Sequence, residues 1–147
     1  MKISTRARYG MRAMLEIAKH YDKGPVSIKE VARKQEISEK YLEQLLVFLR
    51  SAGLVKSIRG AKGGYILARS PEEIKLTQVV QVLEGSLAPV DCVDNPSVCK
   101  RSGFCPTRDV WNLLKQSIAQ VLYSITLQGL VEREEQKLKD KPLVYNI

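Results

Sequence analysis

Aromatic side chains and histidine are scarce in this chain of 147 residues. Phe, Trp and Tyr make up 6% of the sequence, and His20 is its single histidine. A lone histidine at the end of a helix with one apolar stripe is better explained as a helix-terminal charge than as a general base. We therefore expect neither an enzyme nor a small-molecule substrate.

Long apolar runs and paired cysteines are also missing. No stretch approaches the run of about 18 apolar residues that a membrane-spanning helix needs. The first residues carry charge without the apolar segment of a secretory signal. The three cysteines are an odd number, which argues against a disulfide framework and favours a reducing compartment. These absences predict a cytoplasmic protein without a membrane partner.

Positive charge is abundant but unevenly distributed. Residues 1–70 hold 15 Lys and Arg against 6 Asp and Glu, a net charge of +9. Residues 71–147 hold 9 against 10, a net charge of −1. This asymmetry favours a polyanionic partner, most simply nucleic acid, although a solvated basic surface is the plainer alternative.

The order of predicted elements in residues 1–85 is typical of a winged helix-turn-helix domain in a mainly α protein. Apolar spacing, serine caps and glycine-rich turns define these elements. In chain order they are helices over 5–21, 27–34 and 38–51, strands over 54–59 and 65–68, and a helix over 77–84. The glycine-rich loop 60–64 is not a phosphate-binding P-loop, because no Ser or Thr follows Lys62 and a strand follows the loop.

The helix over 38–51 and the hairpin loop carry the candidate DNA contacts. A helix-turn-helix places its second helix in the major groove, and a wing can enter the minor groove. Gln44 can pair with adenine, whereas Glu43 repels phosphate and can accept from cytosine, which favours selectivity over affinity. The candidates are Ser38, Lys40, Tyr41, Glu43, Gln44, Arg50, Arg59, Lys62 and Gly63. A winged helix used only for protein contacts is the alternative.

Residues 86–106 form an irregular segment that carries all three cysteines, Cys92, Cys99 and Cys105. Their neighbours are mostly polar, so the thiols are better explained as ligands than as core residues. Soft thiolates select iron–sulfur clusters, copper(I) or zinc, but the spacing lacks the close cysteine pair and the histidine of most structural zinc sites. A thiol redox switch and inert thiols also stay open.

Residues 107–147 are predicted to form a dimerisation helix and a C-terminal tail. The helix is expected over 107–128 with Thr107 as its cap, and the charged stretch 132–141 as a frayed tail. Apolar residues at steps of three and four form the candidate dimer seam. They are Trp111, Leu114, Ile118, Val121 and Ile125.

Three stretches carry a resemblance to a known family, namely MKISTRARYGMRAMLEIA, SEKYLEQLLVFLRSAGLVKSIRGAKGGYILARSPEEI and ITLQGLV, together with the cysteine loop. The chain resembles the bacterial winged-helix regulators that include IscR, NsrR, RirA and CymR, and is most like IscR. The resemblance implies a homodimeric transcription regulator that binds a pseudo-palindromic operator in double-stranded DNA. It also makes Glu43 similar to a glutamate that limits promoter choice in IscR.

For the cysteine loop, the resemblance implies an iron–sulfur cluster, [2Fe-2S] or [4Fe-4S], on the three cysteines, through which iron–sulfur status, oxygen or nitric oxide would control operator affinity. The familiar fourth ligands, a His and an Asp, are replaced by Arg108 and Arg8. Asp91, Asp94, Asp109, a thiol or water are left as candidates. The alternatives are a CymR-like regulator of sulfur or cysteine metabolism, acting through thiol chemistry or a protein partner, and a zinc-binding interaction module.

Overall fold

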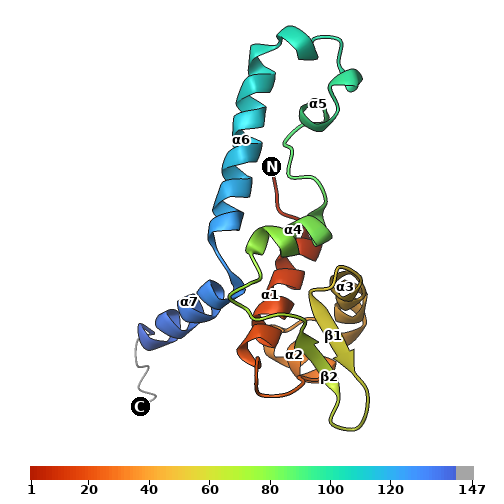
Figure 1. Ribbon diagram of the computed structural model, residues 1–147, viewed down its shortest axis with the longest axis vertical. Helices are drawn as coiled ribbons and strands as arrows, with labels where there is room; N and C mark the ends of the chain where they lie inside the picture. Colours follow the sequence, from red (N-terminus) through yellow and green to blue (C-terminus); the bar gives the residue numbers. More distant parts are fainter. Residues whose placement is uncertain (142–147) are drawn as a thin grey trace, which may run out of the picture.

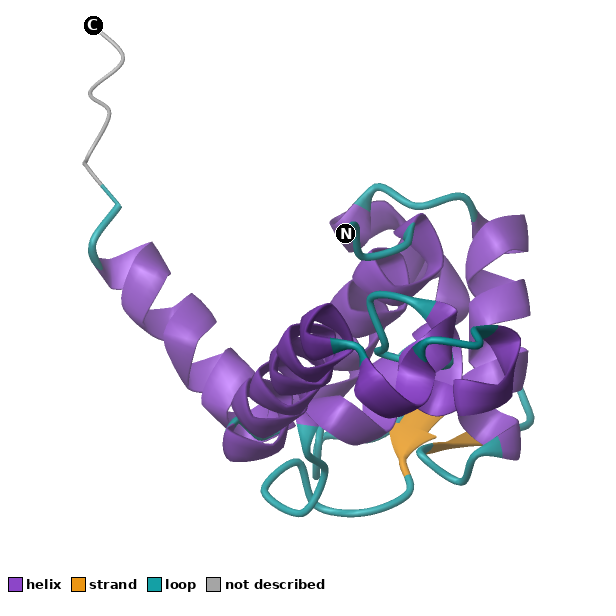
Figure 2. Cartoon of the chain, turned by 90° about the horizontal axis from the view of Figure 1, so that it is seen from above, coloured by secondary structure: helices purple, strands orange, loops and turns teal. Residues whose placement is uncertain are grey.

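The structure is a computed structural model that describes residues 1–141 and consists of helices and one β-hairpin (Figures 1 and 2). Residues 142–147 of the predicted C-terminal tail lie outside the described residues. The elements are α1 (Thr5–Lys19), α2 (Ile28–Gln35), α3 (Glu39–Ser51), β1 (Val55–Ile58), β2 (Gly64–Leu67), α4 (Leu76–Glu84), α5 (Asp91–Asp94), η1 (Pro96–Val98), η2 (Ser102–Phe104), α6 (Pro106–Ser124) and α7 (Leu127–Lys139).

Serine side chains begin the first three helices. The hydroxyls of Ser4, Ser27 and Ser38 each accept, at 3.0–3.2 Å, a hydrogen bond from the backbone N–H three residues further on. These caps satisfy amide groups that have no partner inside the helix. Glu36 adopts a left-handed conformation, with φ at 54°, between α2 and α3. The predicted helix-turn-helix is therefore confirmed.

The two strands pair as an antiparallel hairpin with Val55 opposite Leu67. Val26, which lies two residues before α2, extends this sheet by a bridge to Tyr65, with backbone hydrogen bonds of 2.8 and 3.0 Å. Gly64 makes the close approach possible, because a Cβ at this position would lie 2.2 Å from the carbonyl oxygen of Val26. The hairpin is thus attached directly to the helix-turn-helix.

Helix α1 lies at the centre of the molecule and packs against α2, α3, α4 and α7 (Figure 1). The contact with α4 is close, since a Cβ on Gly10 would lie 2.0 Å from Cδ1 of Leu83. Large side chains that are almost fully buried fill the space around α1. They are Met14, Ile17, Leu42, Leu45, Leu46, Leu49, Leu54, Ile74, Leu83 and Leu127.

The prediction that Thr77 caps a helix was wrong by two residues. Helix α4 begins at Leu76 with Lys75 as its N-cap. The cause is a long-range pairing of the backbone, since Lys75 forms an antiparallel bridge with Thr126 and the N–H of Leu76 donates to the carbonyl of Ile125 at 2.9 Å. No local pattern in the sequence reveals such a contact.

The predicted helix over 107–128 also differs from the structure at both ends, and the same pairing accounts for its early end. Helix α6 begins at Pro106, with Cys105 rather than Thr107 as its N-cap, and ends at Ser124. Ile125 is extended and lies outside α6, and Thr126 caps a separate helix, α7, through a 3.0 Å hydrogen bond from the N–H of Gly129. The charged stretch 132–141 is helical as far as Lys139 and not frayed.

In the described part of the chain one charged side chain, Glu16 of α1, is buried, with 1% of its surface exposed. It forms ion pairs of 3.3 Å with Lys19 and with Lys34 of α2. Lys19 also reaches Glu134 of α7 at 3.1 Å. Gln35 donates to the Glu16 carboxylate at 3.0 Å, so this cluster joins three helices.

Burial by itself would raise the pKa of Glu16, but the hydrogen bond from Gln35, the charge of Lys19 and the hydrogen bonds from Lys19 and Lys34 outweigh it. The pKa of Glu16 therefore lies below its ordinary value. Burial by itself would lower the pKa of Lys19. The hydrogen bond to Glu134 and the charge of Glu16 outweigh this effect, so the pKa of Lys19 is raised. A carboxyl group with a lowered pKa stabilises the fold at neutral pH, and this contribution is lost as the pH falls through the pKa of the folded state.

We expect the substitution Glu16→Gln to lower the free energy of unfolding at pH 7 by roughly 1.5–3 kcal/mol, the range for a hydrogen bond to a charged group. Solvent screening of the partly exposed lysines favours the lower end of this range. The difference from the wild type should shrink as the pH falls through the lowered pKa of Glu16, where the wild-type carboxylate itself becomes protonated. Urea unfolding followed by circular dichroism at pH 7 and at successively lower pH values measures this, with the exposed Glu43→Gln as control. Equal stabilities of wild type and Glu16→Gln at pH 7 would contradict the expectation.

Candidate functional site

Helix α3 presents one apolar and one polar face. Leu42, Leu45, Leu46 and Leu49 point into the core, and the predicted contacts Ser38, Lys40, Glu43, Gln44 and Arg50 are exposed. Tyr41 is half-buried, and its ring packs edge-on against that of Tyr9 with centroids 6.0 Å apart. The structure therefore leaves the polar face of the second helix free, as DNA recognition in the major groove requires.

We call residues 1–85, which contain α1–α4 and the hairpin, the head. The β1–β2 hairpin extends from the head at the end of the molecule opposite to the cysteine loop (Figure 1). Arg59 and Lys62 are exposed in its loop. Gly63 has a structural role there, because a Cβ would lie 2.1 Å from the carbonyl oxygen of Ile58 and 2.9 Å from that of Gly60. A side chain at position 63 would open the turn that carries the two cations.

Three cations line one concave surface between the end of α3 and strand β1. They are Arg50, Lys56 and Arg59, and all three are exposed. Lys56 is absent from the contacts predicted from sequence, although its place next to the buried Val55 on a half-buried strand indicates that it faces solvent. A groove of cations is suited to follow a phosphate backbone.

The cysteine loop, residues 86–106, has hardly any core of its own, since Ser102 is its one fully buried residue. Cys92 and Cys105 are half-buried, Cys99 is exposed, and all three are free thiols. Within residues 1–141, no three His, Cys, Asp or Glu side chains gather in an arrangement that could hold a metal ion. The three thiols suit a thiolate-bound metal or cluster by their chemistry, but the loop must close to bring them together.

Two contacts tie the cysteine loop to α6. Nε of Arg108 donates to the backbone carbonyl of Cys92 at 2.8 Å, and Nζ of Lys115 pairs with the Asp94 carboxylate at 2.6 Å. The ammonium group of Lys115, and next the hydroxyl of Ser86, hold the pKa of Asp94 below its ordinary value. The sequence alone did not indicate either contact.

Cys105 lies directly before α6. Its sulfur is 3.1 Å from the hydroxyl of Thr107, and this hydrogen bond, together with the backbone N–H of Arg108, lowers the pKa of the thiol. Positive charge on Arg101 acts in the same direction. A thiol at the N-terminus of a helix with a lowered pKa is readily converted to the nucleophilic, metal-binding thiolate.

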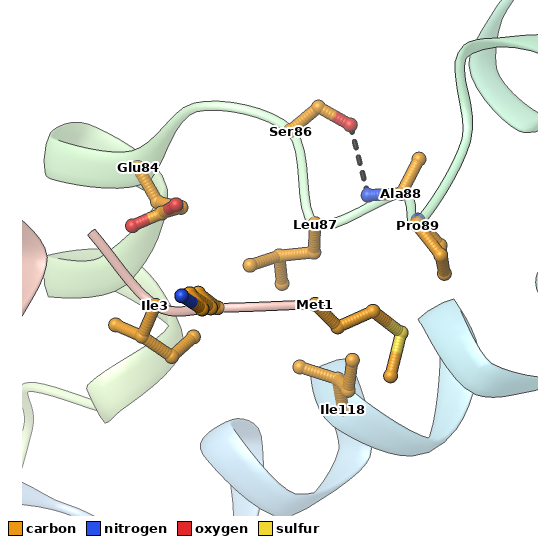
Figure 3. Close-up of a pocket in the computed structure, with 9 residues that line it drawn as sticks. Met1, Ile3, Glu84, Ser86, Leu87, Ala88, Pro89 and Ile118 are labelled. Atoms are coloured by element: carbon orange, nitrogen blue, oxygen red, sulfur yellow. Dashed lines mark hydrogen bonds between the residues drawn. The ribbon is translucent and has the colours of Figure 1, made fainter.

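Helix α6 has no buried residue. Its C-terminal part packs against α4 and the core, and its N-terminal part projects beyond the head (Figure 1). Of the predicted seam, Leu114, Ile118 and Ile125 are half-buried within the chain, whereas Trp111 and Val121 are exposed. Ile118 lines an apolar cavity together with Met1 and Leu87, as Figure 3 shows. Two further apolar residues of α6 that are not part of the predicted seam, Val110 and Leu113, are also exposed.

Together, the exposed polar face of α3, the cations beside it and the hairpin define a DNA-binding protein of the winged helix-turn-helix class. The model of the Rrf2 family, described as an iron-dependent transcriptional regulator, matches residues 3–133. The chain belongs to the Rrf2 family and is a DNA-binding transcription regulator, not an enzyme. Within residues 1–141, no helix has the length and apolar character to cross a membrane.

Relatives of two kinds are similar to this chain. The transcriptional regulator CymR of Bacillus subtilis is 44% identical over 130 residues, which cover 88% of this chain and 89% of CymR. The structure of T. potens IscR is 44% identical, with a TM-score of 0.78 and coverage of 99% of this chain and 94% of that one. The structure of B. subtilis CymR gives 41% identity, a TM-score of 0.77 and coverage of 90% and 98%. These values confirm the predicted family and fold and do not separate an IscR-like from a CymR-like regulator.

We expect Arg59→Ala to weaken DNA binding several-fold, because it removes a cation from the hairpin and from the groove beside α3. The probe is a duplex selected from a random library by the wild-type protein, which we refer to as the selected operator. The slope of log K against log salt concentration should become less steep by about 0.9 for one lost phosphate contact. Lys137→Ala, which removes an exposed cation from α7, serves as control. Unchanged affinity and slope for Arg59→Ala would show that Arg59 makes no contact with DNA.

Proposed function

We propose that the protein is a homodimeric transcription regulator whose operator affinity is controlled by an iron–sulfur cluster on Cys92, Cys99 and Cys105. One observation carries this proposal: all three thiols lie on the single loop that connects the DNA-binding head to α6. The second support is the chemistry of the donors, because three soft thiolates without a nearby histidine favour a cluster over zinc.

The position of the loop suggests how the site acts on DNA binding. The loop leaves α4, which packs against α1 in the head, and enters α6, which carries the exposed apolar residues. A bound cluster would supply a link between the three thiolates that iron shortage, oxygen or nitric oxide can break. Gathering the thiols must change the path of the loop and with it the angle between α6 and the head. A coupling of about 1–3 kcal/mol, or 5- to 150-fold in affinity, is typical of such linkage.

The contacts of the loop reduce the number of candidates for the fourth ligand of the proposed cluster. The guanidinium of Arg108 donates to the Cys92 carbonyl and has no acceptor atom, so it supplies no ligand. Asp94 is engaged by Lys115 and Ser86. The exposed carboxylates of Asp91 and Asp109, an external thiol or water are the remaining candidates.

A CymR-like thiol switch is the second candidate function, and the lowered pKa of Cys105 favours it. The structure of the oxidised form of Staphylococcus aureus CymR is also similar to this chain, at 37% identity and a TM-score of 0.73. A switch of this kind would use the same loop and the same link to α6, but would need no metal.

The proposed dimer forms through α6. Two-fold pairing of this helix would place two α3 helices about one turn of DNA, roughly 34 Å, apart on a pseudo-palindromic operator. The exposed side chains Val110, Leu113 and Val121 support this pairing, because α6 leaves them in contact with water in the single chain.

Protein purified without oxygen should be coloured and should contain iron and acid-labile sulfide. Mössbauer and UV–visible spectra would distinguish a two-iron from a four-iron cluster.

Cys99→Ser changes an exposed thiol and should lose the cluster while keeping the fold, with Ser97→Ala of the same loop as control. A colourless, iron-free protein that is reconstituted only by zinc would overturn the cluster. Iron-free protein whose affinity for the selected operator changes on oxidation with diamide, and returns with dithiothreitol, would favour the thiol switch.

We expect Val121→Glu to give a monomer, because it places a charge in the proposed α6 pairing. Val121 is the better test position than Ile118, whose replacement would also disturb the packing against Met1 within the chain. Sedimentation equilibrium gives the mass, and Gln120→Glu adds the same charge at the neighbouring exposed position as control. A Val121→Glu dimer as stable as the wild-type dimer would place the interface elsewhere.

A further inference from the structure

The last residue of α2, Gln35, is held on two sides by α1. Its amide nitrogen donates to Glu16 at 3.0 Å, and its amide oxygen accepts from Nε of Arg12 at 3.2 Å. A second nitrogen of the Arg12 guanidinium donates to the backbone carbonyl of Gln35. This residue directly precedes the turn between α2 and α3, so its position sets where the turn begins.

The same guanidinium also reaches towards α3 through two aromatic rings. It lies 5.2 Å from the centroid of the Tyr9 ring, and Tyr9 packs edge-on against Tyr41. Tyr41 belongs to the first turn of α3, where its N–H donates to the Ser38 cap. Arg12 therefore contacts the element before the turn directly, and the element after it through Tyr9.

The geometry points to Arg12 as a positioning residue, which fixes the angle of the α3 recognition helix and does not contact DNA. Two of its nitrogens already donate to Gln35, its face is occupied by Tyr9, and the side chain is half-buried. Cations such as Lys40 and Arg59 are exposed and have the freedom that a phosphate contact needs.

Such a role has a specific consequence for binding. Base readout depends on the alignment of α3 in the major groove, whereas non-specific binding depends on the number of cations near phosphates. Loss of the Arg12 contacts should therefore weaken sequence-specific binding and leave non-specific binding unchanged.

The test compares Arg12→Lys and Arg12→Met on the selected operator and on a scrambled duplex of the same composition, over a range of salt concentrations. Lysine keeps the charge but cannot reproduce the planar two-nitrogen contact with Gln35, and methionine removes the charge. Both variants should bind the operator about tenfold more weakly, within the range for one lost base contact. Binding to the scrambled duplex and the salt slope should equal those of the wild type. Arg33→Ala, an exposed cation of α2, is the charge control.

Two outcomes would overturn the assignment. If Arg12→Met weakens binding to both duplexes and reduces the salt slope by about 0.9 while Arg12→Lys binds normally, Arg12 is a phosphate contact. If neither variant changes operator affinity, the contacts to Gln35 and Tyr9 have no effect on α3.

Circular dichroism establishes that the variants are folded at the assay temperature. Where they are not, Tyr9→Leu interrupts the same chain of contacts at the ring, and Tyr9→Phe keeps the ring as its control. Tyr9→Leu should reproduce the selective loss of operator binding and Tyr9→Phe should bind like the wild type. Normal operator binding by Tyr9→Leu would again overturn the proposal.

Discussion

The arrangement of the molecule depends on a short backbone pairing between two segments that lie some fifty residues apart in the chain, 74–76 and 125–127. The N–H of Leu76 donates to the carbonyl of Ile125, and the N–H of Leu127 donates to that of Ile74, each at 2.9 Å. Ile74 and Leu127 are fully buried at this point. The pairing starts α4, ends α6 and starts α7, so it attaches the α6 arm and the cysteine loop to the DNA-binding head. Any change in the loop that reaches the head through the backbone must pass through α4 or through this pairing.

Local signals in the sequence account for most of the head. Ser27 and Ser38 cap their helices where a serine before an apolar stripe predicts it, and the glycine-rich loop marks the hairpin. The two errors in helix starts have different causes, one distant in the sequence and one local. Thr77 and Thr107 are plausible caps by residue type, but the pairing with residues 125–127 moves the first start, and Pro106 at the first helical position moves the second. Thr126 is also a good cap by residue type. The end of α6 before it is not evident from the sequence, because the apolar step of four from Val121 to Ile125 continues the helical pattern.

In the candidate site, too, some features can be predicted from local sequence and others depend on distant segments. Exposure of the polar face of α3 follows from its apolar period, so residue spacing was sufficient to locate it. The contacts of Arg12 and Arg108 could not be read from spacing, because each depends on a carbonyl group of another segment. Arg108 illustrates the consequence. A comparison of residue types shows only that a familiar ligand is missing, whereas the structure shows a cation that holds the backbone of Cys92 against α6.

The structure also shows that only part of the positive charge of the head is available to bind DNA. The 15 basic residues in residues 1–70 are not equivalent, since Arg12, Lys19 and Lys34 are engaged with Gln35 or with the buried Glu16. These three stabilise the scaffold that presents the others. The exposed cations near the candidate DNA surface are those at the start and end of α3, on β1 and in the hairpin loop, namely Lys40, Arg50, Lys56, Arg59 and Lys62. Net charge therefore indicates the partner, while the number of phosphate contacts depends on which cations the fold leaves free.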